Sequence, residues 1–185
     1  MLNEKKSHQQ RPVVDDFAVD EKIVEKNGQK FLIKRGSAVI REANILTSIG
    51  KHGNVLDVVD AVVDAVDSDE NFMCYEYLPF ILPAFYAEPN LNESKILLDI
   101  ACALQHVHSK GVIHRDIKPT NVFVDISGTA KLGGFGLATI LGNEQLEPET
   151  GSYRYMAPEV IKHEPYDFSA DVFSYGMLTI KCYQC

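Results

Sequence analysis

The eight residues from His114 to Asn121 constrain this chain more than any other stretch. They place a carboxylate (Asp116), an ammonium (Lys118) and a carboxamide (Asn121) between a helix-like apolar pattern and the β-like run 122–124. In phosphoryl transfer, such a carboxylate accepts or orients a hydroxyl proton, the ammonium neutralises the moving phosphate, and the carboxamide ligates Mg²⁺. The stretch therefore predicts a phosphoryl-transfer loop; the alternative is a solvated turn that contains these residues by chance.

Three further motifs follow this loop. Residues 131–138 have the sequence K-L-G-G-F-G-L-A, residues 155–159 are Y-M-A-P-E, and Asp171 begins the run D-V-F-S-Y-G. Together with H-R-D-x-K-P-x-N, these motifs resemble the eukaryotic protein kinase superfamily. Lys118, two residues after Asp116, resembles the lysine that serine/threonine kinases carry at this position. The amino-acid sequence of residues 150–159 is similar to that of the tyrosine-kinase-like group, which includes integrin-linked-kinase and Raf relatives.

The resemblance implies an α+β, two-lobed protein-kinase-like fold. A small β-rich N-lobe is expected at residues 13–78, after a disordered leader at residues 1–12. A partial, helical C-lobe is expected at residues 79–185, ending within the helix that the family calls F. That helix is apolar on all sides, so it should be buried, and the family's later helices would be missing.

The resemblance also implies site residues, with ATP and Mg²⁺ as cofactors. The implied catalytic residues are Asp116, Lys118 and Asn121, the implied ATP-binding residues are Lys34, Glu42, Glu76, Leu78 and Phe123, the implied metal ligand is Asn121, and the implied regulatory residues are Arg115, Thr150 and Ser152. A phosphate on the loop would pair with the arginine, and Ser152 aligns with a hydroxyl that bonds the catalytic aspartate and lysine. Three alternatives stay open: Glu42 as a solvated acid, residues 72–78 as a buried strand without a ligand, and loop hydroxyls that are never modified.

Several positions depart from the family pattern. Gly134 stands 18 residues after Asp116, where the family has the aspartate that binds the principal Mg²⁺. Glycine has no ligand atoms, and Asn121 alone is a poor site for an ion that prefers several oxygens. The glycine-rich phosphate lid is not recognisable, since residues 13–34 contain a single glycine, and Leu32 replaces a small alanine over the adenine. Lys34 and Glu42 are eight residues apart, about half the usual separation.

Local patterns predict the main elements. Asn27-Gly28 between two apolar runs predicts a hairpin, and the apolar spacing predicts a helix at 38–49. One strand is expected within 55–66, another at 72–78 and a short helix within 84–92. Asn92 is the expected N-cap of a long helix at 93–109, which Gly111 ends.

Composition and net charge limit the kinds of partner and the location that we expect. The net charge of −8 argues against nucleic acid, and no apolar run reaches the ~20 residues of a membrane span. The polar N-terminus is unlike a secretory signal, so a cytoplasmic location is expected. The lone Cys182-x-x-Cys185 pair lacks a second pair for a zinc site.

Three functions remain open at this level. The first is a serine/threonine kinase that phosphorylates a protein substrate, with its activity impaired by Gly134 and the absent lid. The second is a pseudokinase that binds protein partners without turnover. The third is a kinase fragment with no function of its own.

Overall fold

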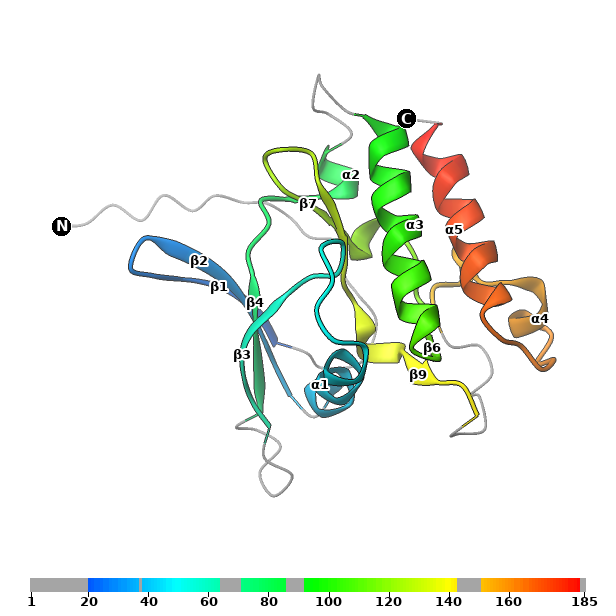
Figure 1. The fold of residues 1–185 in the computed structure, drawn as a ribbon, viewed down its shortest axis with the longest axis horizontal. Helices are drawn as coiled ribbons and strands as arrows, with labels where there is room; N and C mark the ends of the chain where they lie inside the picture. Colours follow the sequence, from blue (N-terminus) through cyan, green and yellow to red (C-terminus); the bar gives the residue numbers. More distant parts are fainter. Residues whose placement is uncertain (1–19, 37, 64–70, 86–91, 143–150, 184–185) are drawn as a thin grey trace.

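The computed structural model describes residues 20–36, 38–63, 71–85, 92–142 and 151–183. A sheet with one helix forms the first part of the chain, and two long helices lie side by side in the rest (Figure 1). The α+β fold expected from the sequence is confirmed. The expected leader and the start of the expected N-lobe, residues 13–19, lie outside the described residues, and the lobe boundary after residue 78 stays a prediction.

The main sheet has four antiparallel strands in the order β1-β2-β4-β3. The predicted hairpin is confirmed: Asn27 and Gly28 both have positive φ, 54° and 76°, as a two-residue turn of this kind requires. The strand expected within 55–66 is shorter, and Val55 instead bridges to Leu132. The strands are β1 (Asp20–Lys26), β2 (Gln29–Arg35), β3 (Val58–Val62) and β4 (Phe72–Glu76).

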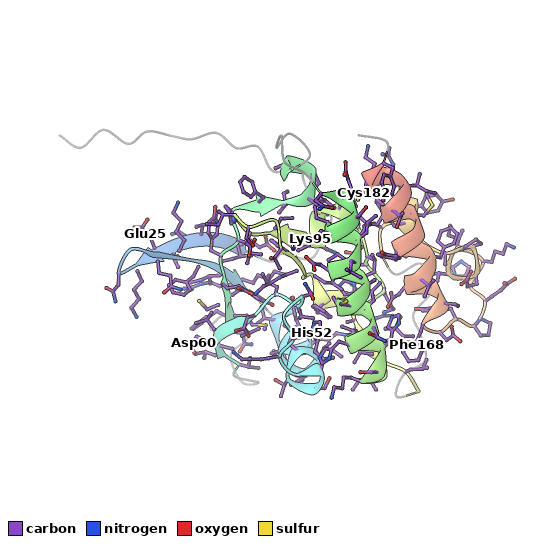
Figure 2. The ribbon with its side chains drawn as sticks, turned by 45° about the horizontal axis from the view of Figure 1, so that its top comes forward. Glu25, His52, Asp60, Lys95, Phe168 and Cys182 are labelled. Carbon is purple, nitrogen blue, oxygen red and sulfur yellow. The ribbon has the colours of Figure 1, made fainter. Side chains whose placement is uncertain are left out.

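Helix α1 (Ala38–Ile49) forms where the apolar spacing predicts it. It buries Val39, Ile45 and Ile49, and its Val39 end joins a core cluster with Leu32 and Met73 of the sheet. The loop after α1 packs on the long helix α3 through the stacked rings of His52 and His106, whose centroids are 4.6 Å apart. Figure 2 shows His52 beside that helix.

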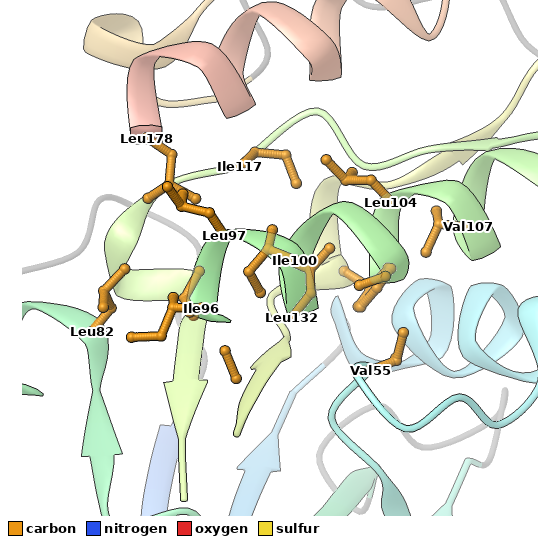
Figure 3. Close-up of a cluster of buried hydrophobic side chains, with 14 of the residues drawn as sticks. Val55, Leu82, Ile96, Leu97, Ile100, Leu104, Val107, Ile117, Leu132 and Leu178 are labelled. Atoms are coloured by element: carbon orange, nitrogen blue, oxygen red, sulfur yellow. The ribbon is translucent and has the colours of Figure 1, made fainter. Parts of the chain in front are cut away.

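Helix α3 (Glu93–Ser109) confirms the prediction for residues 93–109. The Asn92 side chain caps it by accepting a hydrogen bond from the Lys95 N–H at 3.0 Å, and Gly111, with φ of 75°, follows its end. Its buried stripe forms the centre of the larger core, and Leu178 of α5 (Ser169–Cys182) is buried in the same cluster (Figure 3). The stripe consists of Ile96, Leu97, Ile100, Ala103, Leu104 and Val107.

Short elements connect these parts. The short helix α2 (Leu82–Phe85) overlaps the helix expected within 84–92 only at its first two residues, and residues 86–91 of that prediction lie outside the described residues. Two small sheets, β5-β7-β8 and β6-β9, contact α3 through β8 and β6. The remaining elements are β5 (Phe80–Ile81), α2 (Leu82–Phe85), β6 (Val112–Ile113), η1 (Pro119–Asn121), β7 (Val122–Val124), β8 (Ala130–Leu132), η2 (Phe135–Leu137), β9 (Thr139–Ile140), η3 (Tyr153–Tyr155) and α4 (Pro158–Ile161).

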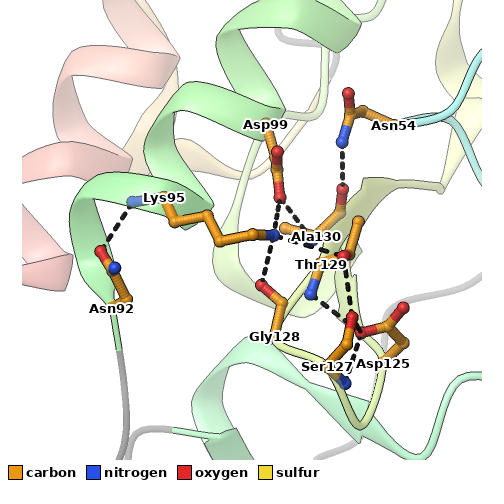
Figure 4. A network of polar contacts seen from close by, with 9 residues as sticks. All are labelled: Asn54, Asn92, Lys95, Asp99, Asp125, Ser127, Gly128, Thr129 and Ala130. Atoms are coloured by element: carbon orange, nitrogen blue, oxygen red, sulfur yellow. Dashed lines mark hydrogen bonds and ion pairs between the residues drawn. The ribbon is translucent and has the colours of Figure 1, made fainter.

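A polar network fixes the turn between β7 and β8 to α3 (Figure 4). The Asp125 carboxylate accepts hydrogen bonds from the Ser127 N–H at 2.8 Å and the Thr129 N–H at 2.9 Å. Lys95 donates to the Asp99 carboxylate at 2.8 Å and to the Gly128 carbonyl at 2.9 Å. The network holds β8 in place, and β8 leads directly into the Gly133-Gly134 segment.

Within the described ranges, none of the helices combines the length and apolar character that crossing a bilayer requires.

Candidate active site

The loop at residues 114–121 is held from below by one buried carboxylate on α5. Asp171 is fully buried, and it accepts hydrogen bonds from the His114 N–H at 2.7 Å and the Arg115 N–H at 2.8 Å. His108 of α3 donates to the same carboxylate at 2.8 Å. These bonds hold Arg115 at φ of 66°, a left-handed conformation that costs a side-chain-bearing residue about 1–2 kcal/mol. The loop geometry is therefore imposed by α5.

His114 connects the loop to the segment that follows β8. Its Nε2 donates to the Gly133 carbonyl at 3.0 Å, and its Nδ1 accepts from the Asp116 N–H at 3.2 Å. The ring packs edge-on against Phe135, with centroids 4.6 Å apart. Burial lowers the pKa of His114 below its ordinary value, against the pull of Asp171 and Asp116. The ring is therefore neutral at physiological pH.

The three predicted catalytic residues lie together around the Asp116 carboxylate. Its Oδ2 accepts from the Lys118 ammonium at 2.8 Å and from the Asn121 amide at 2.9 Å. Its Oδ1 accepts from the Ser152 hydroxyl at 2.9 Å, and Lys118 also donates to that hydroxyl at 2.8 Å. A serine hydroxyl thus lies between a base and a cation. This arrangement can take up a hydroxyl proton and neutralise negative charge beside it.

Gly134 and Asn121 occupy the predicted metal position. A Cβ on Gly134 would lie 2.5 Å from Asn121 Cγ and 2.6 Å from its Oδ1, so the Asn121 side chain fills the space of a residue-134 side chain. The Asn121 amide N–H₂ group faces the Asp116 main-chain carbonyl at 2.7 Å as well as its carboxylate. Among the described residues, no three His, Cys, Asp or Glu side chains form a metal-binding group. The residues present do not fit Mg²⁺, which prefers several oxygens in octahedral geometry.

Lys34 and Glu42 form an ion pair of 3.3 Å across β2 and α1. Glu42 is 3% exposed and also accepts from the Phe135 N–H at 3.2 Å, so its interpretation as a solvated acid is wrong. Burial alone would lower the pKa of Lys34, but the Glu42 and Glu21 carboxylates outweigh burial and raise it. The ammonium is therefore permanently charged.

Glu21 is a site residue that the sequence argument missed. Its carboxylate lies 3.6 Å from the Lys34 ammonium, from the neighbouring strand β1. The two residues are direct cross-strand partners in the β1–β2 ladder. That register follows from the two-residue Asn27-Gly28 turn, so counting outward from the turn could have found the pair.

The segment after β4 is where adenine is expected to bind. The Glu76 N–H donates to the Asp57 carbonyl at 3.0 Å, so the main chain of Glu76 can offer adenine only its carbonyl. The Glu76 carboxylate is held by Lys131 of β8 at 2.7 Å. Leu78 is buried, and Phe123 packs against the cluster that contains Leu32 and Leu78. Around this segment the described residues thus place a buried apolar cluster, the Glu76 carbonyl and the Lys34 ammonium.

Arg115 extends toward η2 and the segment between α4 and α5. Its Nε donates to the Leu137 carbonyl at 2.6 Å and its Nη1 to the Tyr166 hydroxyl at 3.4 Å. Its Nη2 is buried and has no hydrogen-bond partner in the part of the chain that the structure describes. Thr150, another predicted regulatory residue, lies outside that part, so the pairing of a phosphate there with Arg115 stays a prediction.

The family model of the protein kinase domain matches residues 11–184. The chain belongs to the protein kinase family. This kinase domain is 44% identical over 85 residues to serine/threonine-protein kinase STY46 of Arabidopsis thaliana, an alignment that covers 45% of the chain and 15% of the relative. It is 30% identical over 177 residues to cysteine-rich receptor-like protein kinase 6 of Oryza sativa subsp. japonica, covering 84% of the chain and 25% of the relative.

This kinase domain is also similar to a Raf kinase. It is 43% identical over 93 residues to the RAF proto-oncogene serine/threonine-protein kinase of Xenopus laevis, covering 44% of the chain and 15% of the relative. The expected resemblance to serine/threonine kinases of the tyrosine-kinase-like group is confirmed. The chain spans between 15% and 25% of the length of these relatives, so their complete activities are not its own by similarity alone.

Proposed function

We propose that this chain is a serine/threonine-kinase domain that engages protein serine or threonine hydroxyls and transfers phosphoryl groups from ATP only weakly. The observation that supports it is the Ser152 hydroxyl, held 2.9 Å from the Asp116 carboxylate and 2.8 Å from the Lys118 ammonium. A substrate hydroxyl in the same place would find a proton acceptor and a cation already aligned. ATP would supply the phosphoryl group, and Lys34 and the segment from Glu76 to Leu78 would hold it.

The weakness of the proposed transfer follows from Gly134. Without a carboxylate there, and with Asn121 bonded to Asp116, the described residues lack the groups that neutralise a phosphate through a metal ion. Losing one charge-stabilising group in an active site commonly reduces the rate by about 10²–10³. The chain's own contribution is then limited to orienting the hydroxyl, accepting its proton at Asp116 and placing the Lys118 charge beside it.

A second candidate is a binding module that engages protein partners without turnover. It is favoured by the closure of the Asn121 side chain over Gly134, which leaves the phosphoryl-transfer loop saturated with its own hydrogen bonds. In this case the kinase domain would keep its shape and present its surface to partners. A cytoplasmic location remains a prediction of the sequence.

Phosphate transfer to a serine/threonine peptide mixture, with radiolabelled ATP and Mg²⁺, separates the two candidates. The variants are wild type, Asp116→Asn, Gly134→Asp and the double variant. Slow transfer by wild type that Asp116→Asn abolishes, and that Gly134→Asp raises by about 10² or more, supports the kinase proposal. Transfer that Asp116→Asn leaves unchanged, or no transfer by wild type, contradicts the kinase proposal and leaves the binding module.

A further inference from the structure

Lys34 is shared between two carboxylates, and only one of them belongs to the pair predicted from the sequence. Glu42 lies 3.3 Å from the ammonium and Glu21 lies 3.6 Å from it. Glu21 and Lys34 face each other across β1 and β2, so their side chains project from the same face of the sheet. Glu21 therefore lies on the side of the sheet that faces α1 and the proposed nucleotide site.

The two carboxylates have different surroundings. The Glu42 side chain is 4% exposed and holds both Lys34 and the Phe135 N–H, so it is part of the packed interior. The Glu21 side chain is 34% exposed, at the open side of the pair. A ligand approaching Lys34 from solvent meets the Glu21 carboxylate at its edge.

A triphosphate at Lys34 would lie beside this fixed negative charge. One ammonium between two carboxylates already carries a net negative charge, and the repulsion of a polyphosphate within a few ångströms is strong at a partly buried site. A divalent cation would offset the repulsion, but Gly134 and Asn121 do not provide a place for one. The proposed adenine end of the site is different, because Leu32, Tyr75 and Leu78 there belong to a buried cluster of apolar and neutral side chains.

We propose that Glu21 determines ligand specificity, making this site favour an uncharged purine nucleoside over a nucleoside triphosphate. The inference rests on the nucleotide site of the proposed function and adds a residue that selects between ligand classes. Glu21 competes with phosphates for the Lys34 ammonium, while the nucleoside portion of either ligand meets the same apolar lining. The selectivity is electrostatic, so it weakens as salt screens the charges.

The test is calorimetric binding of adenosine and of ATP to the whole chain in EDTA, with wild type, Glu21→Gln and Glu25→Gln. Glu25 is the matched control, because it lies on the same strand, is exposed, and pairs across the ladder with Lys30 instead of Lys34. Wild type should bind adenosine more tightly than ATP. Glu21→Gln should tighten ATP about tenfold, which is the change expected from removing one like charge near a partly buried site. Its adenosine affinity should stay within about twofold, and Glu25→Gln should change neither.

Two results overturn the inference while leaving the nucleotide site standing. One is wild type that binds ATP more tightly than adenosine, and the other is a Glu21→Gln variant that binds ATP no better than Glu25→Gln does. Salt dependence adds an independent check, because raising the ionic strength should narrow the difference in affinity between adenosine and ATP in wild type. If no variant binds either ligand, the nucleotide site itself is absent, and the inference falls with it.

Discussion

The Asn121 side chain occupies the space into which a side chain at residue 134 would project, with its Cγ 2.5 Å from where a Cβ on Gly134 would lie. The glycine therefore does more than remove a ligand atom. It allows the asparagine to close onto Asp116, where the amide satisfies both the main-chain carbonyl and the carboxylate. The predicted metal ligand, Asn121, is thus turned toward the predicted catalytic base, Asp116.

Gly134→Ala tests this closure through stability. The new Cβ collides with Asn121, and φ of 78° is strained for alanine, so we expect a loss of about 2 kcal/mol in the free energy of unfolding. In an Asn121→Ala background the collision disappears, and the same change should cost only about 1 kcal/mol, the backbone term. Urea unfolding of the four proteins measures the coupling. Equal costs in both backgrounds would mean that the two side chains do not compete for space.

Lys34→Met should destabilise the chain strongly. The substitution leaves the nearly buried Glu42 carboxylate without its cation, which typically costs about 3 kcal/mol or more. Lys51→Met is the control, because Lys51 is 80% exposed in its pair with Asp57, and such pairs contribute under about 1 kcal/mol. Thermal and urea unfolding measure both losses. Similar losses for the two variants would show that Glu42 is solvated in solution.

Asp171→Asn should loosen the loop at residues 114–121. The buried carboxylate accepts from two main-chain N–H groups and from His108, and an amide would turn a donor toward at least one of them. We expect a loss of about 3 kcal/mol, together with faster hydrogen exchange at His114 and Arg115. Asp167→Asn, at an exposed position just before α5, should cause a much smaller loss and leave that exchange unchanged. Exchange rates that stay slow in Asp171→Asn would mean that other contacts fix the loop.

The parts of the fold that the sequence predicts correctly are those with strong local chemistry. The Asn27-Gly28 hairpin needs two residues that tolerate positive φ, and the helix at 93–109 begins at a side-chain cap and ends before a glycine. Helix α2 begins at Leu82, before the predicted bounds, because a first helical turn accepts Pro83, whose missing N–H is not needed there.

The site was predicted less completely, because its geometry depends on contacts between distant segments. The grouping of Asp116, Lys118 and Asn121 follows from one short loop, but the closure of Asn121 over Gly134 depends on how that loop meets the segment after β8. The burial of Glu42 likewise depends on tertiary packing, which its separation of eight residues from Lys34 in the sequence does not reveal. The position of Glu21 was missed but could have been predicted, since its place opposite Lys34 follows from the hairpin register alone.

Mild acid should destabilise the chain through its buried histidine. His114 uses Nδ1 to accept from the Asp116 N–H and Nε2 to donate to Gly133, so protonating the ring breaks the first bond and buries a charge. Burial lowers the native pKa of His114 below the unfolded value of about 6.5. The folded state therefore binds fewer protons, so its stability is complete above about pH 6.5 and decreases as the pH falls below it, with a limiting slope of about 1.4 kcal/mol per pH unit.

A second, smaller contribution to the same pH dependence comes from His52. Burial and the neighbouring His106 lower the pKa of His52, and its Nδ1 accepts from the Asn54 N–H at 3.1 Å. His52 is more open to solvent, so screening should reduce its share. Urea unfolding of wild type and His52→Gln between about pH 7.5 and 5.5 measures both contributions, because this window spans the ordinary histidine pKa. The variant should retain most of the acid loss, since His114 remains. Stability that rises on acidification, or a loss that disappears entirely in His52→Gln, would contradict the assignment to His114.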